Sequence, residues 1–154
     1  MATVEVTFTP LPAHVRTARL VATAVARRSG VDEALLDEVR LAVGEACSRA
    51  VEAHRRHCPA EPVKIEMTDQ GERFVVVVSD QAPTPGASTG ASAGANGHGL
   101  GPGAATLVQG ADDAGIPAGF GLAVISGLAD DVHVSSTSSG VSVRMSWPSA
   151  TPVA

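Results

Sequence analysis

Apolar and polar residues alternate or recur in patterns that divide the first half of the chain into elements. Residues 4–9 alternate and are followed by two prolines, which predicts a strand that stops there. Apolar residues then recur at helical spacing from Pro12 to about Arg28, and again from the N-cap residue Asp32 to about His57. The pattern predicts one strand followed by two helices, the second longer than the first.

The second half of the chain is predicted to pair its strands. A hairpin signal lies at residues 69–71, and residues 121–130 have the apolar spacing of a short helix. The remaining strands are predicted at residues 63–68, 73–80, 131–137 and 141–147. Hairpin-linked strands indicate an α+β fold, a two-layer sandwich with a mostly antiparallel mixed sheet and the helices on one face.

Residues 82–118 differ in composition from the rest of the chain. They hold nine of the sixteen glycines, together with many Ala, Ser and Pro residues. Such a segment cannot bury enough apolar surface to offset the entropy lost on ordering it. We therefore expect a flexible loop inserted in a single domain that spans residues 1–154.

Composition and charge narrow the classes of partner. With 154 residues and 44 % hydrophobic content, the chain can bury the core of one domain. A formal net charge of -5 argues against a nucleic-acid partner, which requires a basic face. The sequence contains no apolar run long enough to span a membrane and no leader-like N-terminus, so we expect no membrane association and a cytoplasmic location.

Several kinds of catalytic or metal site are disfavoured. Cys47 and Cys58 are too few for a disulfide framework and are expected to be free thiols. The five histidines are scattered, so no metal site is expected. Gly-x-Ser-x-Gly patterns around Ser88 and Ser92 lie in low-complexity sequence rather than between a strand and a helix, which leaves no convincing hydrolase nucleophile.

Three places in the sequence could hold a ligand. Glu45 and Arg49 are four residues apart on the second helix and form either an exposed ion pair or, among small neighbours, part of a ligand site. Asp80 ends a strand, where it either caps a turn or accepts a hydrogen bond from an exocyclic amine. Gly119 and Gly121 precede an apolar helix, where they form either an anion site or an ordinary helix entry.

The order of these features resembles one family. Glu45 with Ala46 and Ala50, the strand-end Asp80, the glycine-rich segment and a Gly-x-Gly-Leu box at 119–122 follow one another as in the anti-sigma-factor serine kinases of the GHKL (Bergerat-fold) ATPase superfamily. The resemblance covers residues from about 5 to 148. It implies a histidine-kinase-like ATPase domain in which residues 82–118 correspond to the ATP lid.

The resemblance also implies roles for single residues. Glu45 matches the general base that acts on a serine hydroxyl of an anti-anti-sigma protein, and Asp80 matches the carboxylate that recognises adenine. Gly119, Gly121 and Leu122 match the box at the hinge of the ATP lid.

Partners and cofactors are implied in the same way. Arg19, in the first helix, falls where relatives contact a sigma factor. The implied partners are a sigma factor, a STAS-type anti-anti-sigma protein and a second copy in a homodimer. The implied cofactors are ATP and Mg²⁺.

Three positions depart from the family pattern. Arg49 replaces an asparagine that ligates magnesium, and a guanidinium offers no acceptor for a cation. Ala82 replaces a glycine near adenine, and Val141 replaces a threonine. Arg49 could instead pair with phosphate oxygens.

These departures leave two functions open. The first is an anti-sigma factor that regulates transcription by partner switching, binds ATP and phosphorylates an anti-anti-sigma protein. The alternative is a degenerate, nucleotide-independent protein-binding regulator with the same fold. The catalytic domain of a histidine kinase is disfavoured, because no dimerisation helix with a phosphoacceptor histidine precedes the domain in this sequence.

Overall fold

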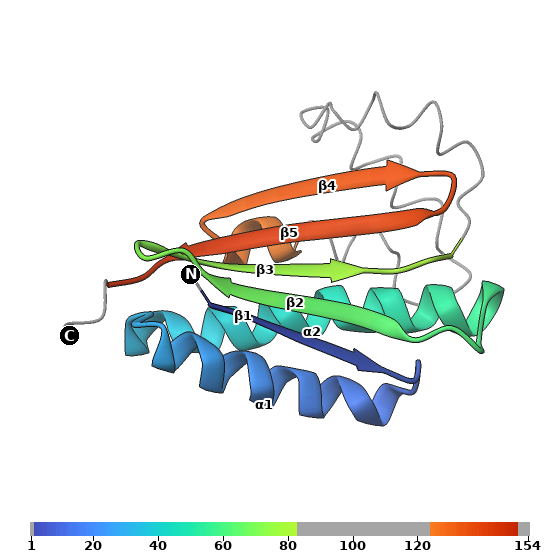
Figure 1. The fold of residues 1–154 in the computed structure, drawn as a ribbon, viewed down its shortest axis with the longest axis horizontal. Coiled ribbons are helices and arrows are strands. Elements are labelled where there is room, and N and C mark those ends of the chain that lie inside the picture. Colours follow the sequence, from blue (N-terminus) through green and yellow to red (C-terminus); the bar gives the residue numbers. More distant parts are fainter. Residues whose placement is uncertain (1, 83–123, 151–154) are drawn as a thin grey trace.

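A computed structural model describes residues 2–82 and 124–150 of the chain (Figure 1). Its elements follow the predicted order of a strand, two helices, two strands, a short helix and two strands. They are β1 (Ala2–Phe8), α1 (Pro12–Arg28), α2 (Glu33–His57), β2 (Val63–Asp69), β3 (Arg73–Ser79), a short helix at 124–128, β4 (Asp131–Thr137) and β5 (Gly140–Pro148).

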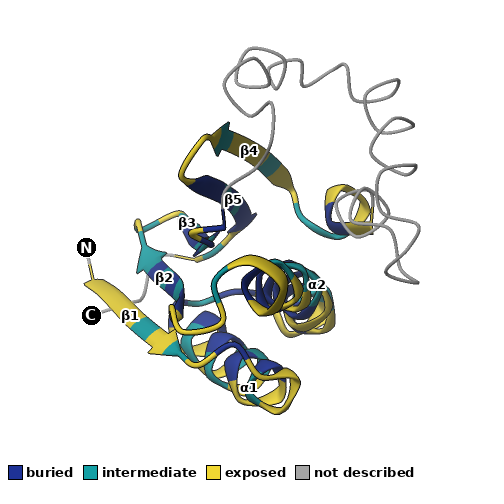
Figure 2. Ribbon diagram, turned by 90° about the vertical axis from the view of Figure 1, so that its right-hand side faces the viewer, coloured by how far each residue is buried: buried dark blue, intermediate teal, exposed yellow. Residues whose placement is uncertain are grey.

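The strands form one five-stranded sheet with the order β1-β2-β3-β5-β4. All four pairings between neighbouring strands are antiparallel, so the described strands include no parallel pair. Helices α1 and α2 lie side by side on one face of this sheet (Figure 2). The predicted α+β fold is confirmed, and β3 lies at the centre of the sheet.

Local sequence explains the bounds of both long helices. A proline begins α1, where its missing N–H breaks no hydrogen bond, and Gly30 follows the helix with φ +92°. At the start of α2, the Asp32 carboxylate accepts a hydrogen bond from the N–H of Ala34 at 2.9 Å. The same helix ends at His57, just before Cys58 and Pro59. These stop and start signals are local, which is why the predicted bounds hold.

The core lies between the sheet and the two helices. In β2 the buried residues alternate with partly exposed ones, as the sequence pattern requires of a strand with one covered face. Phe74 of β3 is paired across the sheet with Trp147 of β5, and both are buried. The indole N–H of Trp147 donates to the carbonyl oxygen of Leu128 at 3.0 Å, which fastens the short helix to the sheet.

Both cysteines are free, as predicted. Cys47 faces the core from α2, and burial raises the pKa of its thiol to about 12, although nearby Arg19 acts in the opposite direction. A thiol in that state is protonated at neutral pH and behaves as a small apolar side chain. In the part of the chain that the structure describes, no helix combines the length and the apolar character needed to cross a bilayer.

A buried histidine connects the last turns of α2 to two loops. The Nε2 atom of His54 accepts a hydrogen bond from the N–H of Gln81 at 2.8 Å. Its Nδ1 atom therefore carries the proton and donates to the carbonyl oxygen of Glu61, also at 2.8 Å. His54 is 0 % exposed, so the neutral ring satisfies two backbone groups that water does not reach.

We expect His54→Ala to lower the free energy of unfolding by about 2–4 kcal/mol. The substitution leaves a cavity and removes the hydrogen-bond partner of the Glu61 carbonyl and of the Gln81 N–H. The control is His57→Ala, an exposed histidine at the end of the same helix, which should change it by less than about 0.5 kcal/mol. Urea unfolding of both variants measures the difference. Equal losses in the two would contradict the bridging role.

Candidate functional site

The candidate site lies where α2 passes the end of β3. Asp80 follows the last residue of β3, and Arg49 reaches it from the middle of α2. The Nη1 atom of Arg49 donates to Oδ2 of Asp80 at 2.9 Å. The side chains are 18 % and 1 % exposed respectively, so the pair is largely removed from water.

The second carboxylate oxygen of Asp80 is also engaged. Oδ1 accepts from the N–H of Ala82 at 3.1 Å, a turn contact, and from the N–H of Val141 in β5 at 3.2 Å. The backbone N–H of Asp80 in turn donates to the carbonyl oxygen of Val141 at 2.9 Å. A buried carboxylate needs such donors, since burying an unpaired charge is costly. Three elements therefore meet at one side chain.

A glycine allows β5 to approach this carboxylate so closely. Gly140 has φ +148°, and a Cβ atom built there would overlap the carbonyl oxygen of Asp80. Position 140 therefore has no space for a side chain while the Asp80 junction stays in place.

Glu45 does not form the helix ion pair that its spacing from Arg49 allows. Arg49 turns to Asp80 instead, and Glu45 is half-buried one turn earlier on α2. Among the described residues, the side chain of Glu45 has no hydrogen-bond or ion-pair partner.

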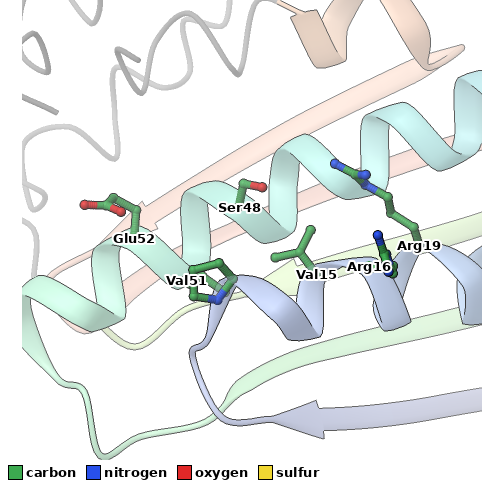
Figure 3. Close-up of a pocket in the computed structure, with 7 residues that line it drawn as sticks. Val15, Arg16, Arg19, Ser48, Val51 and Glu52 are labelled. Atoms are coloured by element: carbon green, nitrogen blue, oxygen red, sulfur yellow. The ribbon is translucent and has the colours of Figure 1, made fainter. Parts of the chain in front are cut away.

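Arg19 belongs to a different place in the fold. Its guanidinium lies over Gly44 of α2, where a Cβ atom would overlap Nε, and that Nε is buried without a hydrogen-bond partner among the described residues. A groove of about 280 Å³ runs between α1 and α2 at this point (Figure 3). It is lined by Pro12, Val15, Arg16, Arg19, Ser48, Val51 and Glu52. Neither Arg49 nor Asp80 lines this groove.

The other site residues expected from the sequence lie outside the described residues. These are Gly119, Gly121 and Leu122 of the glycine box, together with residues 83–118 of the predicted lid. The structure therefore brings Arg49 and Asp80 together and places Glu45 one helical turn away.

The residues at this site do not fit ATP with magnesium in the manner that the resemblance implies. Both oxygens of Asp80 already accept hydrogen bonds and its side chain is only 1 % exposed, so an adenine amine could approach the carboxylate only if protein groups moved aside. The Arg49 guanidinium is a cation without an acceptor atom and cannot ligate a metal ion. Pairing with Asp80 also commits Nη1, which limits the phosphate contact considered for Arg49.

Sequence reasoning named both members of the pair but not their contact. It also missed His54 and the backbone donors of Ala82 and Val141. The sequence held one hint of the pair, which is an arginine on a helix predicted to cover the sheet and an aspartate at the end of a predicted strand. The sequence does not encode that approach locally, because Arg49 and Asp80 are 31 residues apart.

A double-mutant cycle should show that the Arg49–Asp80 pair couples α2 to the sheet. We expect Arg49→Ala to lower the free energy of unfolding by roughly 3–5 kcal/mol, because Asp80 is left buried without its cation. The coupling energy with Asp80→Asn should reach about 1–3 kcal/mol. Urea unfolding of the two single variants and the double variant provides the measurement.

The matched control for this cycle is the ion pair between Arg40 and Asp37 on the same helix. Its nitrogen and oxygen atoms lie 2.8 Å apart, but the side chains are 45 % and 77 % exposed. Solvent screening should reduce that coupling to about 0.5 kcal/mol or less. A coupling for the buried pair no larger than the control would show that the contact does not hold the two elements together.

Comparisons with known proteins agree with this architecture. Among solved structures, the chain is similar to the crystal structure of the RsbU and RsbW domains of Rv1364c from Mycobacterium tuberculosis, with a TM-score of 0.63 and 14 % sequence identity over 100 % of this chain. This chain spans 35 % of the length of that one, and at such identity the likeness shows the fold alone. A search of curated proteins found no match to the sequence.

The family assignment rests on a sequence model. The model for the histidine kinase-like ATPase domain matches residues 8–147, which include both long helices, β2 to β5 and the Arg49–Asp80 junction. We conclude that the chain belongs to the histidine kinase-like ATPase domain family.

Proposed function

We propose that this protein is an anti-sigma factor that regulates transcription by partner switching and binds its protein partners without needing ATP. Membership of the histidine kinase-like ATPase family and the fold shared with a chain that contains an RsbW domain support the proposal. The proposed partners are a sigma factor and a STAS-type anti-anti-sigma protein, bound in the cytoplasm by one copy of the chain or by a homodimer.

The observation that carries the nucleotide-independent form is the state of Asp80. Its carboxylate is 1 % exposed and accepts hydrogen bonds from Arg49, Ala82 and Val141. Because the carboxylate is buried, a ligand amine could reach it only if Arg49 moved aside, and charge-assisted hydrogen bonds such as that of Arg49 are the stronger kind. Binding of a sigma factor or a STAS-type protein, as proposed here, does not require Arg49 to leave Asp80.

The outer surface of α1 and α2 supports a protein partner. Arg19 and Arg16 border the groove between the helices, and Leu20 of α1 and Leu41 of α2 are 61 % and 49 % exposed. Arginines and exposed leucines on the same pair of helices are residue types that protein-binding surfaces use. Arg19 is the residue that we propose contacts the sigma factor.

Serine kinase activity is the second candidate. It is favoured by Glu45, whose half-buried carboxylate has no hydrogen-bond or ion-pair partner among the described residues. Such a carboxylate could accept the proton of a serine hydroxyl on an anti-anti-sigma protein. The Arg49–Asp80 pair is the observation that makes this candidate the weaker of the two.

Partner binding should not depend on nucleotide. We expect a pairwise interaction screen against the sigma factors and STAS-type proteins of the source organism to identify a partner. Calorimetry on the purified pair should then give the same Kd, within about twofold, with and without ATP and Mg²⁺. A partner that binds only when nucleotide is present would contradict the proposal.

Removing the guanidinium of Arg19 should weaken the same complex. We expect Arg19→Ala to raise the Kd for the sigma factor by roughly tenfold to a hundredfold, as arginine anchors at protein interfaces do. Arg28→Ala is the matched control, because it removes the same charge from the exposed end of the same helix and should change the Kd little. Equal effects of the two substitutions would point to general charge attraction rather than to a docking site at the groove.

Phosphoryl transfer can be tested on the same proteins. Radiolabelled ATP and Mg²⁺ are incubated with the STAS-type partner and either the wild type or Glu45→Gln. We expect no label on the partner in either reaction. Label that appears with the wild type and disappears with Glu45→Gln would establish the kinase instead.

A further inference from the structure

We propose that Arg49 is a built-in substitute for the nucleotide. Its guanidinium occupies the hydrogen-bond position on Asp80 that an adenine amine would take, so the chain's own side chain fills the recognition site. The inference deepens the proposed function and rests on its nucleotide-independent form. It identifies Arg49 as the residue that excludes adenine nucleotides.

Arg49 and an adenine amine would compete for the same carboxylate. Oδ2 of Asp80 faces Nη1 of Arg49 at 2.9 Å, and Oδ1 is shared by the N–H groups of Ala82 and Val141. An adenine amine is a neutral donor. Oδ2 can accept a second hydrogen bond, but the Asp80 side chain is 1 % exposed, so an adenine amine can reach it only if Arg49 moves aside. That movement would separate two buried charges.

The Arg49 side chain also fills the space between α2 and Asp80. The Arg49 side chain starts on α2 and ends at the residue that follows β3, so it crosses from the helix layer to the end of the central strand. With 18 % exposure, most of that length is covered by protein. A ligand that used Asp80 would compete with Arg49 for space as well as for the hydrogen bond.

A second side chain of α2 also binds the end of β3. His54, also on α2, accepts a hydrogen bond from the N–H of Gln81, the residue after Asp80. Two side chains of one helix thus hold two consecutive residues at the end of β3. These contacts join α2 to the end of β3.

The inference predicts that removing Arg49 creates nucleotide affinity. Arg49→Asn removes the charge and the length of the side chain, and it also removes an Nε atom that is buried without a hydrogen-bond partner among the described residues. Ala82→Gly, added to it, removes a Cβ atom beside the freed carboxylate. We expect no saturable calorimetric heat with ATP for the wild type or for Ala82→Gly alone.

For Arg49→Asn we expect measurable ATP binding. For the double variant Arg49→Asn/Ala82→Gly we expect tighter binding, with a Kd at least about tenfold smaller than the smallest Kd that the wild-type titration still allows. Adding Asp80→Asn to the double variant should abolish the gain, because the acceptor charge is lost. Arg40→Asn is the control for removing a cation from α2 and should gain nothing. Adenosine, which lacks phosphates, should shift the amide resonances of Ala82 and Val141 in the Arg49→Asn variant only.

Circular dichroism and thermal unfolding establish that each variant is folded. If Arg49→Asn does not fold, Arg49→Gln carries the same test, since its longer side chain fills more of the vacated space. ATP binding by the wild type that Asp80→Asn removes would overturn the inference. So would a folded Arg49 variant without any gain, or a gain that survives Asp80→Asn. The titration uses no partner protein, so its failure is distinguishable from a failure of sigma-factor binding.

Discussion

A carboxylate that is removed from water has to be surrounded by donors, and this requirement governs the junction of helix and sheet in the protein. Asp80 is 1 % exposed and accepts three hydrogen bonds. Its donors come from α2, from β5 and from the turn after β3. They converge only if α2 lies at one position along the sheet, so the cost of burying the charge fixes how the two layers are aligned.

Other features of the junction depend on the same alignment. Gly140 allows β5 to pass against the backbone of Asp80, and a side chain at that position would overlap it. His54 uses both ring nitrogens to satisfy backbone groups of Gln81 and Glu61. These contacts leave little freedom at the end of β3.

The two candidate surfaces are separate, and this separation bears on function. The groove beside Arg19 lies between α1 and α2 (Figure 3). The Asp80 junction lies between α2 and the end of β3. Changes at the junction therefore need not alter the outer surface of the helices. Under the proposed function, nucleotide recognition is lost at the junction, whereas the outer face of the helices still binds proteins. Glu45, one turn from Arg49, is the feature that a purely protein-binding role does not explain.

Elements with local signals were determined by the sequence alone. The bounds of α1 at Pro12 and Arg28 and the end of α2 at His57 follow from prolines, a cap and helical periodicity, all of which act within a few residues. The hairpins indicated antiparallel pairing for the same reason. The partner of Arg49 could not be found this way. Spacing offered Glu45, four residues away, but the tertiary fold placed Arg49 against Asp80. The Asp80 carboxylate is the more deeply buried of the two, and a buried charge without a partner is costly.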